Sequence, residues 1–259
     1  MRKKGIIFTI LIILLVLAIL ATLFLLIFNI NEFNIDYTNN PLVVNQSELE
    51  TYINSYKGTN TFLFNKEEFI NDVQAKFPYI IIQNVERIPF NKVTVTMTER
   101  LSLFAINSDS KYYLFDAEGF LLEQTDINAG ANGSHACIEI TGLKDKSIGN
   151  LPNEIGTTPT MFSNDDQAKY ILQFFDIMKR LERSYTDLQL KGFCSEIEID
   201  LENNLTISTR YGTTLIIYNF NKFPEEKVQS IMGAFTQGLA SDPSSTLIVK
   251  DDLITILTK

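Results

Sequence analysis

The chain has 259 residues, of which 45% are hydrophobic and 20% are charged, so it carries enough apolar material to fold and is not a disordered protein. Its formal charge is −9, and an acidic chain is a poor candidate for general nucleic-acid binding, which needs clustered Lys and Arg. Two cysteines and one histidine are too few for a disulfide framework, a Cys-rich zinc module or a His-rich metal site.

The first predicted element is a membrane-spanning helix. Three cations near the N-terminus precede an apolar run over residues 6–28, and a helix of that length spans roughly 34 Å, enough for the ~30 Å hydrocarbon core of a bilayer. A cleaved signal peptide would have a shorter apolar region that ends at a small-residue cleavage site, and residues 25–30 contain no such site. Because the cations precede the run, we expect a cytoplasmic tail over residues 1–5, a transmembrane helix over residues 6–29 and an extracytoplasmic remainder.

The next segment, residues 30–101, indicates a small α+β unit. Ser47 and Glu50 have the spacing of a capping box at the start of one helix, and Asn65 is a good N-cap for a second helix that Pro78 ends. Strands are expected before and after the two helices, which gives the order strand, helix, helix, strand, strand. The expected strands are residues 33–37, 79–88 and 93–97.

The last segment, residues 102–259, is richer in predicted strands. The amphipathic pattern of residues 165–183 predicts one helix, and Pro224 opens another whose core face contains Val228, Ile231, Phe235 and Leu239. The expected strands are residues 103–106, 112–115, 120–122, 137–140, 196–202, 205–209, 213–218, 246–249 and 253–257.

Several stretches resemble one family of bacterial proteins. The strand–helix–helix–strand–strand unit directly after a single span resembles a POTRA domain. Its amino-acid sequence is similar to that of the FtsQ/DivIB cell-division proteins. The likeness is carried by the link between the two helices, the helix-to-strand junction, the hairpin, the junction between the two segments and the first hairpin that follows. These are residues 57–64, 77–80, 87–95, 99–105 and 111–122.

The resemblance implies both a fold and a function. The fold is α+β: an N-terminal transmembrane helix, a POTRA domain over residues 30–101 and a mixed α/β FtsQ/DivIB-type β domain over residues 102–259. The function is that of a non-enzymatic, cofactor-free bitopic scaffold of the division septum. Such scaffolds bind other bitopic division proteins of the FtsL and FtsB/DivIC type and help to couple septal cell-wall synthesis to division.

Two other functions stay open at this point. A POTRA-type envelope assembly or secretion factor would normally have tandem POTRA units or a membrane barrel. A membrane-anchored envelope hydrolase needs a nucleophile and a base that converge in a pocket. The one histidine, His135, lies in a polar stretch beside Gly133 and Ser134, so a solvated loop residue is expected there rather than a base or a metal ligand.

The candidate binding residues lie at the C-terminal end of the chain. A terminal strand often leaves one edge unpaired, and such an edge is a template for strand addition by a partner. The candidate partner-binding residues are Thr246, Leu247, Ile248, Val249, Leu253, Ile254 and Ile256, with Leu247, Val249, Ile254 and Ile256 as candidate side chains, some of which must belong to the core. Glu99 and Arg100 are the candidate domain junction, within a stretch that has neither Gly nor Pro.

Three polar features have a plain structural interpretation beside a functional one. Cys137 and Cys194 could form a disulfide or be buried free thiols in strands. Acidic residues at alternate positions, 196, 198, 200 and 202, form a stripe that is expected to be a solvated strand face, since parallel side chains do not converge on a cation. Asp116 and Glu118 are expected in a hairpin turn rather than in a catalytic pair.

Overall fold

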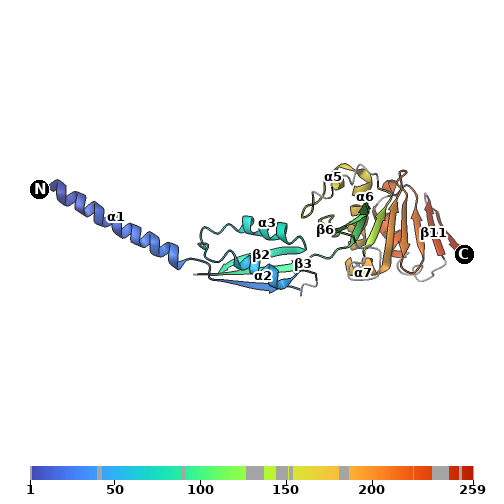
Figure 1. Ribbon diagram of the computed structural model, residues 1–259. Helices are drawn as coiled ribbons and strands as arrows, with labels where there is room; N and C mark the ends of the chain where they lie inside the picture. Colours follow the sequence, from blue (N-terminus) through green and yellow to red (C-terminus); the bar gives the residue numbers. More distant parts are fainter. Residues whose placement is uncertain are drawn as a thin grey trace. The chain divides into compact units, whose positions relative to one another are not determined.

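A computed structural model gives the fold of the chain (Figure 1). The structure describes residues 2–39, 43–88, 91–126, 137–143, 151, 154–180, 187–223, 225–234, 245–250 and 253–258. The chain divides into two compact units, Met1–Arg100 and Leu101–Lys259. Each unit combines helices with a β-sheet, so the predicted mixture of helices and sheets is confirmed.

The N-terminal helix α1 (Arg2–Ile27) exposes most of its described apolar side chains. Their exposed fractions run from 44% at Phe24 to 61% at Leu15. Among the residues that the structure describes, no helix combines the length and apolar character needed to cross a membrane. The transmembrane helix expected over residues 6–29 is therefore not confirmed and stays a prediction.

The rest of the first unit has the predicted order of elements. Its three-stranded sheet has the order β1-β3-β2, in which β1 is parallel and β2 antiparallel to the central strand. The elements are β1 (Glu32–Tyr37), α2 (Gln46–Asn54), α3 (Lys66–Lys76), β2 (Ile80–Ile88) and β3 (Lys92–Glu99).

The alternation of apolar and polar residues in β3 and the side-chain cap of α3 explain why these segments of the first unit form a strand and a helix. Apolar residues of β3 alternate with threonines, and Val93, Val95 and Met97 are fully buried. The side chain of Asn65 accepts hydrogen bonds from the backbone N–H groups of Glu67 and Glu68, so it caps α3 as predicted.

The predicted capping box at Ser47 and Glu50 is wrong. The side chain of Asn45 caps α2, since it accepts hydrogen bonds from the N–H groups of Ser47 and Glu48. The helix therefore starts at Gln46, and Ser47 lies inside its first turn, where its carbonyl oxygen accepts a hydrogen bond from the Thr51 hydroxyl.

The second unit is built on a nine-stranded sheet with the order β12-β11-β10-β9-β8-β7-β4-β5-β6. Its elements are β4 (Phe104–Ser108), β5 (Lys111–Phe115), β6 (Leu121–Thr125), β7 (Ile138–Thr141), α5 (Met161–Asn164), α6 (Asp166–Lys179), α7 (Asp187–Phe193), β8 (Cys194–Ile199), β9 (Leu205–Thr209), β10 (Thr214–Ile217), the 3-10 turn η2 (Phe220–Lys222), α8 (Glu225–Ala234), β11 (Ser245–Lys250) and β12 (Leu253–Thr258).

Three strand pairs in this sheet are parallel, and two of them have a helical crossover. β7 pairs with β8 after α5, α6 and α7, and β10 pairs with β11 after α8; β4 and β7 form the third pair. A parallel pair needs a crossover connection, which usually contains a helix. The remaining strand pairs of this sheet are antiparallel.

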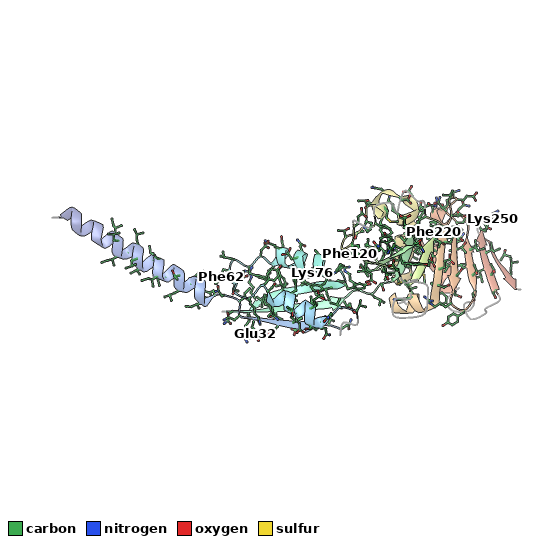
Figure 2. All side chains as sticks on the ribbon, viewed as in Figure 1. Glu32, Phe62, Lys76, Phe120, Phe220 and Lys250 are labelled. Atoms are coloured by element: carbon green, nitrogen blue, oxygen red, sulfur yellow. The ribbon has the colours of Figure 1, made fainter. Side chains whose placement is uncertain are left out.

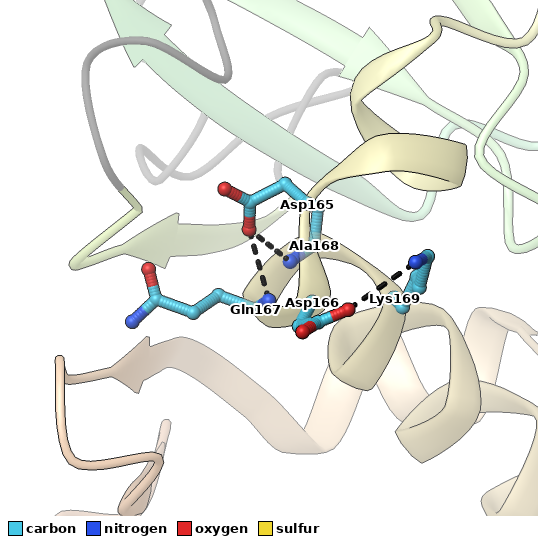
Figure 3. Close-up of polar contacts among 5 residues, drawn as sticks. All are labelled: Asp165, Asp166, Gln167, Ala168 and Lys169. Atoms are coloured by element: carbon cyan, nitrogen blue, oxygen red, sulfur yellow. Dashed lines mark hydrogen bonds and ion pairs between the residues drawn. The ribbon is translucent and has the colours of Figure 1, made fainter.

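The core of the second unit lies between the sheet and its helices. The Phe104 ring stacks on Phe115 and Phe175 with centroid separations of 4.9 Å and 5.2 Å, and all three side chains are fully buried. Helix α6 is held in place by its cap: an Asp165 carboxylate oxygen accepts hydrogen bonds from the N–H groups of Gln167 and Ala168 at 2.9 Å and 3.1 Å (Figure 3).

Several boundaries differ from the sequence predictions. Helix α6 ends at Lys179, before the predicted end at residue 183, and the short helices α5 and α7 were not predicted. The strand expected to continue through Leu201 ends at Ile199, because the Asp200 N–H donates to the Asn204 carbonyl oxygen and turns the chain. Leu201 is consequently 70% exposed. Phe235 and Leu239 lie outside the described residues.

Candidate partner-binding edge

The two edges of the nine-stranded sheet differ in how they are covered. At β6, Leu121 exchanges backbone hydrogen bonds of 2.9 Å with Thr157 and Gly156, so the segment that leads into α5 closes the start of this edge. At the other edge β12 pairs with β11, and within the described part of the chain no backbone hydrogen bond reaches its outer side. Among the described residues, the outer side of β12 is therefore the less covered of the two edges.

The candidate partner-binding residues divide between two faces of the sheet. Leu247 and Val249 are 2% and 1% exposed and belong to the core, whereas Thr246 and Ile248 are half-buried on the opposite face. On β12, the backbones of Leu253, Ile254 and Ile256 pair with Lys250, Val249 and Leu247, and their side chains lie outside the described residues.

One residue of this edge was missed from the sequence. Leu257 is 51% exposed and pairs with Thr246, and Thr255 is also exposed and pairs with Ile248. Paired residues of antiparallel strands share a face, so Thr255 and Leu257 lie on the face opposite the core. The pairing of Leu257 with Thr246, whose side chain lies opposite the core, is the observation that identifies Leu257.

The acidic stripe is not one uniform solvated face. Glu196 is half-buried, pairs with Glu139 across the parallel strands β7 and β8, and accepts a hydrogen bond from the Thr141 hydroxyl at 3.0 Å. Burial, and then the charge of Glu196, raise the pKa of Glu139 above its usual value. Among the described residues, no group of three or more His, Cys, Asp or Glu could hold a metal ion.

Asp200 has a structural role in the turn after β8. One carboxylate oxygen accepts hydrogen bonds from the Glu202 and Asn204 backbones at 2.8 Å and 2.9 Å, and the other accepts one from the Asn204 side chain at 2.7 Å. Burial alone would raise the pKa of Asp200, but these hydrogen bonds outweigh it and hold the pKa below its usual value.

We expect Asp200→Asn to lower the free energy of unfolding of the second unit by about 1–2 kcal/mol at pH 7, because charge-assisted hydrogen bonds are lost. A depressed folded-state pKa contributes stability above the unfolded pKa of about 3.9, and this stability is lost as the pH falls through the folded pKa. The difference between wild type and Asp200→Asn in urea titrations should therefore shrink from pH 7 to pH 3.5. Glu202→Gln is the control, and an equal difference at both pH values would contradict this role.

Several polar and thiol groups of the second unit are buried or have a structural role. Lys191 Nζ lies 3.4 Å from the Ser102 hydroxyl, but the two residues are only 9% and 6% exposed. Cys137 and Cys194 are buried free thiols, and burial raises the pKa of Cys194 to about 12. Asp116 lies in the predicted turn, where its carboxylate accepts hydrogen bonds from the backbones of residues 118 and 120. His135 lies outside the described residues.

The first unit also has one edge that its own side chains cover. On β2, Gln74 accepts a hydrogen bond from the Ile82 N–H and Lys66 donates one to the Val85 carbonyl oxygen, so α3 side chains occupy that edge. At the end of the unit, Glu99 accepts hydrogen bonds from the N–H groups of Val43 and Val44. The Arg100 N–H donates to the Tyr79 carbonyl oxygen, so both predicted junction residues are hydrogen-bonded within the first unit.

Comparisons with known proteins give a consistent set of relatives. No family model matches the chain. It is 30% identical to the cell division protein DivIB of Clostridium tetani over 179 residues, which is 69% of this chain and 60% of that protein. It is also 30% identical to the cell division protein DivIB of Clostridium acetobutylicum over 122 residues, or 45% of this chain and 47% of that protein. The matches thus span about half of each relative.

A solved structure is also similar. It is the major extracytoplasmic domain of DivIB from Geobacillus stearothermophilus, as its trans isomer, with 13% identity and a TM-score of 0.29, and the match covers 54% of this chain and 98% of that one. The two curated relatives bear the same name, and they confirm the resemblance that the sequence motifs indicate. The chain belongs to the FtsQ/DivIB family.

Proposed function

We propose that this chain is a non-enzymatic scaffold of the bacterial division machinery. In this role α1 anchors it in the cytoplasmic membrane at the septum, with the N-terminus in the cytoplasm and both folded units outside. The chain binds bitopic division proteins of the FtsL and FtsB/DivIC type and helps to couple septal wall synthesis to division. The names of the relatives support the process, and the open edge of β12 is the observation that supports a binding role.

The two compact units support the domain assignment in this proposal. The first unit, after α1, has the element order of a POTRA domain, which we place at residues 30–101. The nine-stranded unit is the β domain, residues 102–259, and the division between units falls after Arg100. Glu99 and Arg100 are the proposed junction residues, and the absence of Gly and Pro between Val93 and Ala105 favours a stiff connection.

The exposed side chains of α1 support the membrane anchor. Thirteen large apolar residues of this helix are at least 44% exposed, and they lie on all sides of it. Water would make such exposure costly, at roughly 25 cal/mol per Å² of apolar surface, whereas lipid acyl chains would cover it. The cations near the N-terminus favour a cytoplasmic start.

Strand addition at β12 supports partner binding in physical terms. An added strand would take the backbone hydrogen bonds that the outer side of β12 leaves open, and side chains at alternate positions would select the partner. Thr255 and Leu257 are the exposed described side chains of this strand, beside Thr246 and Ile248 on the same face.

We expect Leu257→Glu to weaken capture of an FtsB/DivIC-type partner by about tenfold, because a carboxylate would lose its water in the new interface. The measurement is co-purification of the full-length chain and the partner from membranes in mild detergent, together with fluorescent fusions that report rings at midcell. Leu201→Glu is the matched control, since Leu201 is equally apolar and 70% exposed but lies in a turn away from this edge. Equal capture by both variants would refute the site, and wild-type fusions spread evenly over the envelope would refute the function.

A further inference from the structure

We infer that the loop between α2 and α3 is a lipid-contacting element, in which Phe62 and Leu63 enter the interfacial region of the membrane beside the end of α1. This inference rests on the proposed membrane anchor. Phe62 and Leu63 are 59% and 73% exposed, whereas Phe64, the next residue, is buried in the core of the first unit. The loop therefore places two large apolar side chains outside the core, and Figure 2 labels Phe62 near the end of α1.

Aromatic contacts join this loop to the last turns of α1. The Phe62 ring is stacked on Phe24 at a centroid separation of 5.3 Å and meets Phe28 edge-on at 5.1 Å. Phe24 and Phe28 also contact each other, at 4.8 Å, so the three rings form one cluster. The cluster continues the exposed apolar surface of α1, where Leu23 and Ile27 are 46% and 57% exposed.

Backbone hydrogen bonds hold the loop against the end of the helix. Thr61 donates twice to the Phe28 carbonyl oxygen, from its N–H at 2.6 Å and from its hydroxyl at 2.7 Å. The Ile30 N–H donates to Thr59, and the Ile30 carbonyl oxygen accepts from Gly58, both at 2.8 Å. A helix end near lipid needs partners for its last carbonyl groups, and this loop supplies one.

The position of Phe62 along α1 sets its depth in the bilayer. The apolar run ends at Phe28, and Phe24 lies about 6 Å further along the helix toward the membrane interior. A ring that contacts both Phe24 and Phe28 therefore lies within the last turn of the apolar stretch, next to the level where aromatic side chains gather at membrane–water interfaces.

The polar residues around the loop fit the same placement. Lys57 is exposed and is the first cation after the apolar run, and the Arg87 guanidinium donates to the Phe64 carbonyl oxygen at 2.6 Å. Lys57 belongs to the same connection between α2 and α3, and Arg87 is bonded to the residue after the apolar pair, as expected of a surface that meets lipid phosphates above the acyl chains. The partner that fits this surface is thus a phospholipid bilayer rather than a second protein.

The test uses tryptophan fluorescence. The chain has no Trp, so all tryptophan emission comes from the single Trp that is introduced. Leu63→Trp is made in the full-length chain, reconstituted into bilayers that contain lipids brominated near the headgroup end of the acyl chains. We expect bromolipids to remove most of its emission and acrylamide in the water to have little effect. Phe62→Trp, which keeps a ring on Phe24 and Phe28, repeats the measurement if Leu63→Trp does not fold.

Two control positions separate the possible outcomes. Leu201→Trp, in an exposed turn of the second unit, should respond to acrylamide and not to bromolipid. Leu17→Trp, in α1, should be quenched by lipids brominated deep in the acyl chains. If Leu17→Trp is quenched by lipid but both loop variants behave like Leu201→Trp, the inference is wrong and the anchor stands. If Leu17→Trp is not quenched by lipid, the anchor fails and this inference fails with it.

Discussion

Replacing Gly142 with alanine is expected to prevent the second unit from folding normally, at a cost of about 4 kcal/mol or more. Gly142 follows β7 with a φ of +81°, a conformation that L-residues with a Cβ rarely adopt. A Cβ at this position would lie 2.2 Å from the Ile199 carbonyl oxygen and 2.9 Å from its carbonyl carbon. Backbone atoms cannot move aside cheaply, so the parallel pairing of β7 with β8 would be disrupted.

Thiol labelling is the measurement for this variant. Both cysteines of the chain lie in the second unit and are fully buried, so their reaction with a thiol reagent during a urea titration reports the opening of that unit alone. Gly192→Ala is the control, because no atom lies within 4 Å of its added Cβ and alanine favours helix α7 by up to about 1 kcal/mol. Wild-type protection of the thiols in Gly142→Ala would show that the close approach to Ile199 is wrong.

The second large effect is expected for Phe104→Ala. Phe104 is fully buried between Phe115 and Phe175 and meets the Phe162 ring edge-on at 6.0 Å. Removing the ring loses its burial and leaves a cavity among three other rings, which costs about 3–5 kcal/mol for a buried Phe. At about 2–4 °C per kcal/mol, the melting temperature of the second unit should fall by roughly 10 °C.

Phe62→Ala is the matched control for that variant. Phe62 has the same side chain but is 59% exposed and belongs to the first unit, so the protection of the two thiols should not change. A melting temperature for Phe104→Ala within about 1 °C of the wild type, a shift typical of surface substitutions, would mean that the ring stack does not hold the sheet to its helices.

Local patterns in the sequence predicted the elements well where one face alone was buried. Val93, Val95 and Met97 alternate with threonines. This two-residue alternation indicates directly which side of β3 faces the core. Asn65 caps α3 as predicted, since both the cap and its N–H donors lie within three residues. The same reasoning placed a turn at Asp116, where side-chain acceptors and backbone donors are again local.

Pairing between distant strands could not be predicted in the same way. That β4 lies between β5 and β7 depends on hydrogen bonds across about thirty residues of chain, which no local pattern records. The terminal position of the last strand predicts an edge strand, and β12 is one, but the exposed Leu257 required the register with Thr246. The sequence identifies the loop at Phe62 only as part of a family motif, because its contact with Phe24 joins segments that are neighbours only after folding.

The order of strands from β7 to β12 follows the order of the chain. If the strands of the second unit form in the order in which they are synthesised, this part of the sheet would grow at one edge, and each new strand would pair with the one formed before it. In a chain that ends before Leu253, β11 would become the edge strand of the sheet. Its residues Thr246 and Ile248 would lie on the face opposite the core. Gain or loss of a final strand would thus shift the proposed docking edge by one strand spacing, about 4.8 Å.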